Sequence, residues 1–401
     1  MSFVIAILGL AFLILVHEAG HFFASLAVGL RPRRFYVGFP PAIAKTRRNG
    51  IEYGIGAIPL GGFVTIPGMH RPIPHDAERR FAHAEDEAPS LGGAVDRVKR
   101  ALAGDDLQAA LYAVDDLDDA LGSVTISPAA RSSAEKGITE LRDALGPDAY
   151  WKAATWRRLV AIVAGPAANI ALTLVIFAIL FTQVGGDPSR TIASVAADSP
   201  AEEAGLLAGD RVIAVDGARV DGVSLGERIV GSDGAPLRLT VVRDGGERTI
   251  VVTPTMIDGG YRIGIVREGT GLPPLEAVGR SFEVTGIVSK EITLSIGRLF
   301  TGEGRDEVSS PIGITRVSSE AAEEGWENYL WVLGLISLSL ALLNLLPLLP
   351  LDGGHILFTL IEGARGRFLK REVYERVSVV GLAVVLLLFF VGLSNDIGKL
   401  S

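Results

Sequence analysis

Four long apolar stretches divide the chain, each with about 20 residues of low charge, the length that a helix needs to cross a bilayer. They cover residues 3–30, 159–184, 328–349 and 377–394. Between the second and third stretches, short alternating runs broken by glycine are typical of a small β-rich domain. We therefore expect an α-helical polytopic membrane protein with four transmembrane helices and one inserted β-rich α+β domain.

The first apolar stretch contains three ionisable side chains within about one helical turn. They are His17, Glu18 and His21 of the sequence HEAGH, and no other side chain in residues 1–30 is ionisable. Residues i and i+4 share a helix face, so the two histidines can bind one metal ion, with Glu18 as general base. Each ionisable group at membrane depth costs about 2.5 kcal/mol or more unless it is paired or ligated. This cost favours a zinc site over a merely polar helix face.

Two histidines leave a tetrahedral zinc ion one protein ligand short if water takes the fourth position. The chain has no cysteine, so the third ligand must be a histidine or a carboxylate. Asp352 ends an uncharged run that begins at Asn328, and Pro347 and Pro350 would break the helix and let the carboxylate turn inward. His355 is a rival, although it lies nearer the basic segment that follows. We favour Asp352 as the third ligand of one Zn²⁺ ion.

Acidic residues are concentrated in one segment of the chain. The formal net charge is −8, and the segment from Asp76 to Asp148 holds 16 acidic and 8 basic residues. Apolar residues recur there at helical spacing. We predict an acidic helical insert at residues 73–150. The remainder is balanced in charge and gives no indication of a nucleic-acid partner.

Lysine and arginine placement predicts the orientation in the membrane. Basic residues follow the first apolar stretch (residues 31–48), precede the second (157–158) and fill the link between the last two (365–376). These segments are expected on the cytoplasmic side of the cell membrane, together with the active site and the acidic insert. The N-terminus and the region from about 185 to 327 are expected outside the cytoplasm.

A β-hairpin is predicted directly after the first span. Asn49-Gly50 is a strong two-residue turn between alternating runs, and the apolar Gly61, Gly62 and Phe63 follow it. Such a hairpin can enter the membrane and offer a free edge to an extended substrate. A simple surface hairpin is the alternative.

The region from about 191 to 253 contains the sequence AGLLAGDRVIAVDG, which resembles a PDZ domain of bacterial proteases. Domains of this type bind peptides by strand addition. Asn169, in the second apolar stretch, is expected to face the bundle interior. There it either steadies the site or the substrate, or makes a plain interhelical hydrogen bond.

These patterns divide the chain into eight parts. They are a first transmembrane helix at 1–30, a membrane-reentrant β-hairpin region at 31–72, the insert at 73–150, a second helix at 151–186, a PDZ domain at 187–268, an amphipathic linker region at 269–326, a third helix at 327–354 and a fourth at 376–395.

HEAGH, NLLPLLPLDGG, AGPAAN and the PDZ-like region together resemble the site-2 proteases, closest to the bacterial regulator-of-sigma-E protease type and its actinobacterial relatives. The resemblance implies that His17, His21 and Asp352 bind zinc and that Glu18 is the catalytic base. It implies that Asn344 of the NxxP motif positions the substrate. The acidic insert lies outside the resemblance.

The sequence PLGGF, at residues 59–63, is similar to the family's membrane-reentrant β-element, which holds substrate as a strand. The implied activity is intramembrane proteolysis of single-pass membrane proteins already cut by a site-1 protease, such as anti-sigma factors, or of remnant signal peptides. The PDZ domain would act as an external filter. This chain shows one such domain where some relatives carry two. The alternative function is a PDZ-bearing membrane scaffold with a structural or inactive metal site.

Overall fold

The computed structural model describes residues 1–104, 106–184, 188–257, 260–301, 304, 308–369 and 371–398. The chain forms two compact units. The first comprises Met1–Leu172 and Ser289–Ser401, and the second comprises Thr173–Val288. Each unit is described by itself.

Four helices in the described part of the chain are long and apolar enough to cross a membrane. They are α1 (Ser2–Ala27), α6 (Thr155–Val184), α11 (Trp326–Asn344) and α13 (Arg371–Gly398). Many large apolar side chains on these helices are exposed, as expected for surfaces that face lipid rather than water. The prediction of four long apolar helices is confirmed.

The third span ends earlier than predicted. α11 ends at Asn344 rather than near residue 349, and α12 (Asp352–Arg365) begins at Asp352. The helix stops because Pro347 and Pro350 lack the amide hydrogen that a continuing helix needs, and because a residue before proline disfavours helical geometry. The irregular segment at residues 345–351 therefore leads directly to the predicted third zinc ligand.

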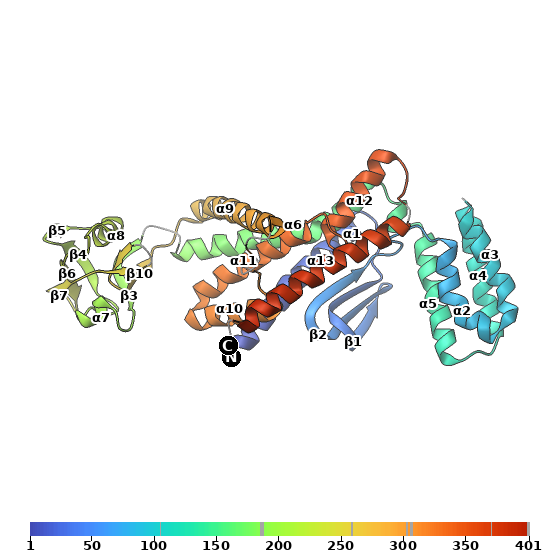
Figure 1. Cartoon of the computed structure of the whole chain (residues 1–401), viewed down its shortest axis with the longest axis horizontal. Coiled ribbons are helices and arrows are strands. Elements are labelled where there is room, and N and C mark those ends of the chain that lie inside the picture. Colours follow the sequence, from blue (N-terminus) through green and yellow to red (C-terminus); the bar gives the residue numbers. More distant parts are fainter. Residues whose placement is uncertain are drawn as a thin grey trace. The chain divides into compact units, whose positions relative to one another are not determined.

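The predicted hairpin is present, and it is folded back on itself. β1 (Arg34–Arg48) and β2 (Ile51–Thr65) are joined by Asn49 and Gly50, both with positive φ as this turn requires. Residues 34–37 pair on one side with 52–55 and on the other with 62–65. Residues 62–65 therefore use one edge for pairing with β1. In Figure 1 this ribbon lies next to α1.

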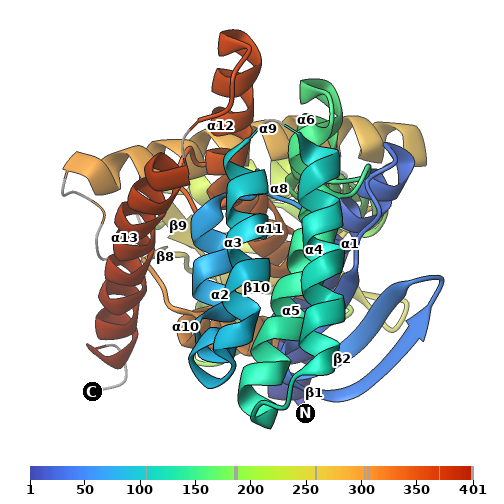
Figure 2. The same cartoon turned by 90° about the vertical axis from the view of Figure 1, so that its right-hand side faces the viewer.

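The acidic insert is a bundle of four helices, which lie side by side in Figure 2. The helices are α2 (Pro74–Glu87), α3 (Gly92–Ala103), α4 (Leu107–Ser123) and α5 (Pro128–Leu145), with a short 3₁₀ turn, η1, at Pro89–Leu91. Phe81, Val98, Leu117 and Ile138 form the centre of a continuous apolar core. The helical spacing noted in the sequence thus supplies this core, while the acidic residues lie outside it.

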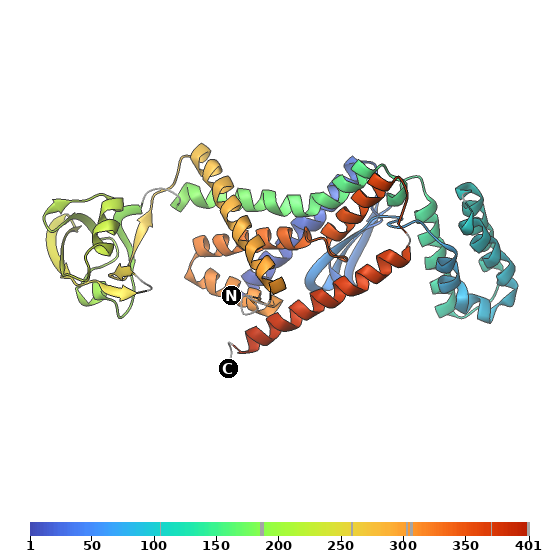
Figure 3. The same cartoon turned by 45° about the horizontal axis from the view of Figure 1, so that its top comes forward.

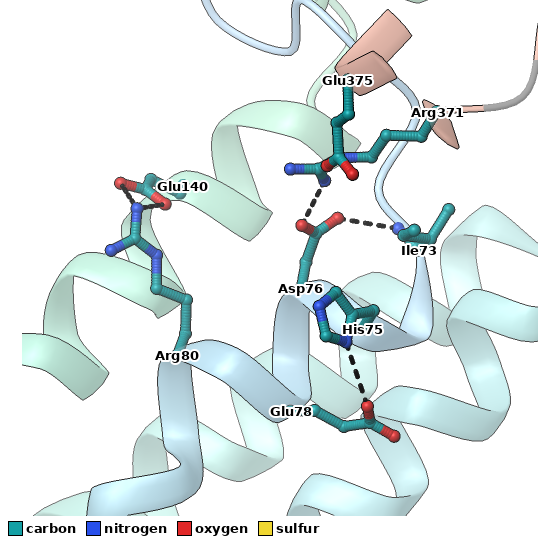
Figure 4. A network of polar contacts seen from close by, with 8 residues as sticks. All are labelled: Ile73, His75, Asp76, Glu78, Arg80, Glu140, Arg371 and Glu375. Atoms are coloured by element: carbon teal, nitrogen blue, oxygen red, sulfur yellow. Dashed lines mark hydrogen bonds and ion pairs between the residues drawn. The ribbon is translucent and has the colours of Figure 1, made fainter. Parts of the chain in front are cut away.

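Both ends of the insert are attached to the rest of the first unit. Arg33 donates to Asp143 (2.7 Å) and to Asp148 (2.8 Å). Asp76 caps α2 by accepting from the Ile73 amide at 3.0 Å, and it also pairs with Arg371 at the start of α13, as Figure 4 shows. After the bundle, a short 3₁₀ turn, η2 (Tyr150–Lys152), leads to α6.

The second unit is β-rich. Its main sheet has the antiparallel order β10-β3-β4-β6-β7, with β5 paired to β4, and its strands curl around an apolar core (Figure 3). The elements are β3 (Pro188–Val195), α7 (Pro200–Glu203), β4 (Arg211–Val215), β5 (Ala218–Arg219), α8 (Gly222–Val230), β6 (Leu237–Arg243), β7 (Gly246–Val252) and β10 (Ile265–Gly269). β8 (Thr255–Ile257) and β9 (Gly260–Arg262) form a separate small ribbon.

The region predicted as an amphipathic linker contains two helices, α9 (Pro274–Thr301) and α10 (Pro311–Glu324). α10 packs against α1 and α11. Its N-terminus is held by Asp396 of α13, whose carboxylate accepts from the amides of Ser310 (2.7 Å) and Gly313 (3.1 Å). A buried carboxylate at a helix N-terminus satisfies amides that have no partner within the helix.

Candidate metal centre

The two HEAGH histidines and Asp352 converge in the first unit. His17 and His21 lie one turn apart on α1, and their Nε2 atoms are 3.3 Å apart. Asp352 Oδ2 is 3.2 Å from His17 Nε2 and 3.3 Å from His21 Nε2. Both histidines are buried, each with 7% of its surface exposed. Three ligand atoms from two helices thus form a nearly equilateral triangle.

This triangle fits a zinc ion. Ligand atoms about 2.0–2.1 Å from a tetrahedral zinc lie about 3.3 Å from each other, and two imidazoles with one carboxylate are typical of catalytic zinc. Three protein ligands leave the fourth position for water or substrate. Within the described residues, this is the one group of three such side chains close enough to share an ion.

Close backbone contacts position Asp352. A Cβ atom added to Gly353 would lie 2.2 Å from the carbonyl oxygen of Leu346, and one added to Gly354 would lie 2.5 Å from the amide nitrogen of Leu349. Only glycine fits at such separations. The two glycines after Asp352 therefore let α12 start tightly against the irregular segment at residues 345–351.

Glu18 lies between the histidines and the β-ribbon. A Cβ atom added to Gly62 would lie 3.0 Å from Glu18 Cγ. The end of β2 thus passes directly beside the residue that the sequence predicts as general base.

The other predicted site residues occupy different positions. Asn344 is the last residue of α11, at the entrance to the segment that carries Asp352. Phe63 stacks on Tyr36 with ring centroids 4.9 Å apart, and Gly61 lies against the ring of Phe39. Asn169 is completely buried, and its backbone carbonyl accepts from the Ser337 hydroxyl at 3.0 Å. That bond joins α6 to α11, in keeping with the expected interior position.

One feature of the site was not predicted. The carbonyl of Ala161, on α6, accepts from His21 Nδ1 at 2.9 Å, and a backbone acceptor leaves no signal in a sequence. Outside the site, His70 packs on Tyr374 with ring centroids 4.6 Å apart, and burial lowers the pKa of His70 to about 4. His355, the rival ligand, is not part of the triangle that Asp352 completes.

A buried site of two histidines and a carboxylate, built on a helix that can span a membrane, defines the class of a membrane zinc metalloprotease. Residues 5–388 match peptidase family M50, and the chain belongs to this family. The expected resemblance to site-2 proteases is thereby confirmed.

Similar proteins cover nearly the whole chain. A putative zinc metalloprotease of Lactococcus lactis is 28% identical, over 96% of this chain and 95% of its own length. The zinc metalloprotease RasP of Geobacillus kaustophilus is 30% identical, over 96% and 95%. The regulator of sigma-W protease RasP of Bacillus subtilis is 29% identical, over 97% and 96%. The chain is therefore a zinc-dependent protease, and the alternative of an inactive scaffold is not supported.

Proposed function

We propose that this protein cleaves peptide bonds inside the membrane, with His17, His21 and Asp352 as the zinc ligands and Glu18 as the catalytic base. The observation that carries the proposal is the ligand triangle with 3.2–3.3 Å sides, two of whose corners lie on a membrane-spanning helix. A metal site on such a helix cleaves peptide bonds that lie within the bilayer.

A zinc ion bound there polarises a peptide carbonyl and lowers the pKa of water. Glu18, next to His17 in the sequence and beside β2, is placed to accept a proton from the attacking water and to return it to the leaving amine. The ring of His21 is oriented by the Ala161 carbonyl, which leaves its Nε2 lone pair for the metal.

The substrate must be extended before it can be cut, because a transmembrane helix hides its peptide bonds in i→i−4 hydrogen bonds. Residues 62–65 pair with β1 on one edge only and lie against Glu18, so an opened substrate segment can add to the ribbon there. Gly61, Gly62 and Phe63 then hold the segment, and Asn344, the last residue of α11, helps to position it. Asn169 supports this arrangement from inside the bundle.

The substrates that fit are single-pass membrane proteins that a site-1 protease has already shortened, such as anti-sigma factors, or remnant signal peptides. The name of the Bacillus subtilis relative, a regulator of sigma-W, supports the first class. The β-rich unit, with its six-stranded sheet, acts in this proposal as a PDZ domain outside the cytoplasm. The active site and the insert face the cytoplasm, in keeping with the basic segments beside them.

The experiment uses purified full-length protein and a model transmembrane substrate. Glu18→Gln should retain one zinc ion and lose cleavage, because it removes the base and leaves the ligands. His21→Ala and Asp352→Ala should lose both, whereas His355→Ala, the matched control, should keep its zinc. Cleavage by Glu18→Gln at the rate of the unmodified protein would overturn the mechanism, and zinc retained by Asp352→Ala would overturn the ligand assignment.

A further inference from the structure

The helix α6 contributes no metal ligand, yet its backbone lies directly against the ring of His21. A Cβ atom added to Gly165 would lie 2.2 Å from His21 Nε2, 2.5 Å from Cε1 and 2.8 Å from Cδ2. These are three of the five ring atoms, so the imidazole lies directly over the Gly165 backbone. Any side chain at this position would occupy the space of the coordinating nitrogen.

The preceding turn of α6 supplies the hydrogen-bond acceptor for the other ring nitrogen of His21, Nδ1. Ala161, one turn before Gly165, receives the Nδ1 proton of His21 at 2.9 Å. By contrast, His17 Nδ1 is buried and has no hydrogen-bond partner among the residues that the structure describes. Of the two histidines, His21 is therefore the one whose tautomer and orientation are set by the protein.

A helical carbonyl can serve this purpose because its oxygen has two lone pairs, so the Ala161 carbonyl can accept from His21 while it remains part of the helix. Pro166 lies inside α6, where its missing amide hydrogen leaves the Ile162 carbonyl, next to Ala161, without its helical donor. Gly165 provides the room for the imidazole, and Ala161 provides the acceptor.

A glycine also lies at this contact on the α1 side. On α1, a Cβ atom added to Gly20, the residue before His21, would lie 2.3 Å from the Ala164 carbonyl oxygen. The two backbones therefore come very close to each other beside the ligand itself.

We propose that Gly165 is a positioning residue for the metal, with the Ala161 carbonyl as its partner. The glycine holds the His21 ring in the plane that points Nε2 at His17 and Asp352, and the carbonyl fixes the tautomer. This inference rests on the proposed function, because it takes His21 as a zinc ligand.

The test is the zinc affinity of Gly165→Ala, measured by competition with a chromogenic chelator on full-length detergent-purified protein. The added methyl group must displace the imidazole or push α6 away, so we expect a loss of about 10- to 100-fold, the usual effect of disturbing a ligand's support. The visible absorption of the cobalt-substituted protein should change with it. Gly286→Ala is the matched control, because it adds the same methyl group to helix α9 with no atom within 4 Å.

A second measurement does not depend on how the variant folds. In ¹⁵N-histidine NMR spectra of the metal-free unmodified protein, assigned with His17→Gln, His21 should carry its proton on Nδ1. A proton on Nε2 would overturn the proposal, as would a folded Gly165→Ala protein with unchanged zinc affinity. His21→Ala separates the two ideas. If that variant keeps its zinc, the proposed ligand set is wrong; if it loses zinc and Gly165→Ala does not, only the positioning role is wrong.

Discussion

The acidic insert and the helices around the metal site are both helical, but their side chains are arranged in opposite ways. In the insert, Phe81 and Leu117 are each 1% exposed and Val98 is fully buried. On the spans, Leu8 is 64% exposed and Val379 68%. The first arrangement suits water, and the second suits lipid.

The contrast shows what holds each region together. In water, burial of apolar area contributes about 25 cal/mol per Å² and organises the insert. Lipid offers no such gain between helices, so close backbone approach and polar contacts organise the spans instead. Gly20 against Ala164 and the Ser337 bond to the Asn169 carbonyl are contacts of that kind. The candidate metal site lies in the second region, beside small residues of this kind.

The largest expected effect tests the insert. Phe81→Ala removes a buried ring from its core and should lower the free energy of unfolding of the bundle by about 3–5 kcal/mol. Zinc content should not change, because the core of the insert and the metal site are separate. Limited proteolysis of the bundle and elemental analysis measure the two quantities. A parallel loss of zinc would show that the two regions are coupled.

A smaller effect is expected when one methyl group is added to each region. Gly20→Ala places a Cβ atom 2.3 Å from a backbone oxygen, and overpacking of this kind costs about 1–3 kcal/mol. Gly93→Ala, in α3 of the insert, meets no atom within 4 Å. We expect Gly20→Ala to lower both the melting temperature and the zinc content, and Gly93→Ala to lower neither. Equal melting temperatures would contradict the idea that backbone approach organises the spans.

The smallest effect concerns the link between the regions. Arg33→Ala removes the ion pairs with Asp143 and Asp148, which are partly exposed and together contribute about 1 kcal/mol or less. Hydrogen exchange at residues 146–151 should become faster, and added salt should produce a similar change in the unmodified protein. Arg97→Ala removes a surface ion pair with Asp116, whose atoms are 4.0 Å apart. This variant is the control and should leave the exchange of these amides unchanged.

Features set by residue type and spacing were predictable from the sequence. The helical period places His17 and His21 on one face, and the uncharged run before Asp352 favoured this residue over His355 as their partner, in agreement with the group that the structure brings together. Contacts between distant backbones were not predictable in this way. Nothing in the residue types at Ala161 or Gly165 says which imidazole comes against α6, because that depends on how two helices approach. For the same reason, the alternation in β2 predicted a hairpin but not its double pairing with residues 34–37.

The way in which the insert joins the chain has a consequence for protein engineering. The amides of Tyr150 and Trp151 donate to the carbonyls of Pro67 (2.9 Å) and Gly68 (3.0 Å), so the incoming and outgoing chain are fastened together at the base of the bundle. Because the two ends are held together in this way, the free energy of closing the connection depends only weakly on the length of chain between them. The junction is therefore a natural splice point, where a short linker or an unrelated reporter domain can replace the bundle while the protease beneath it keeps its shape.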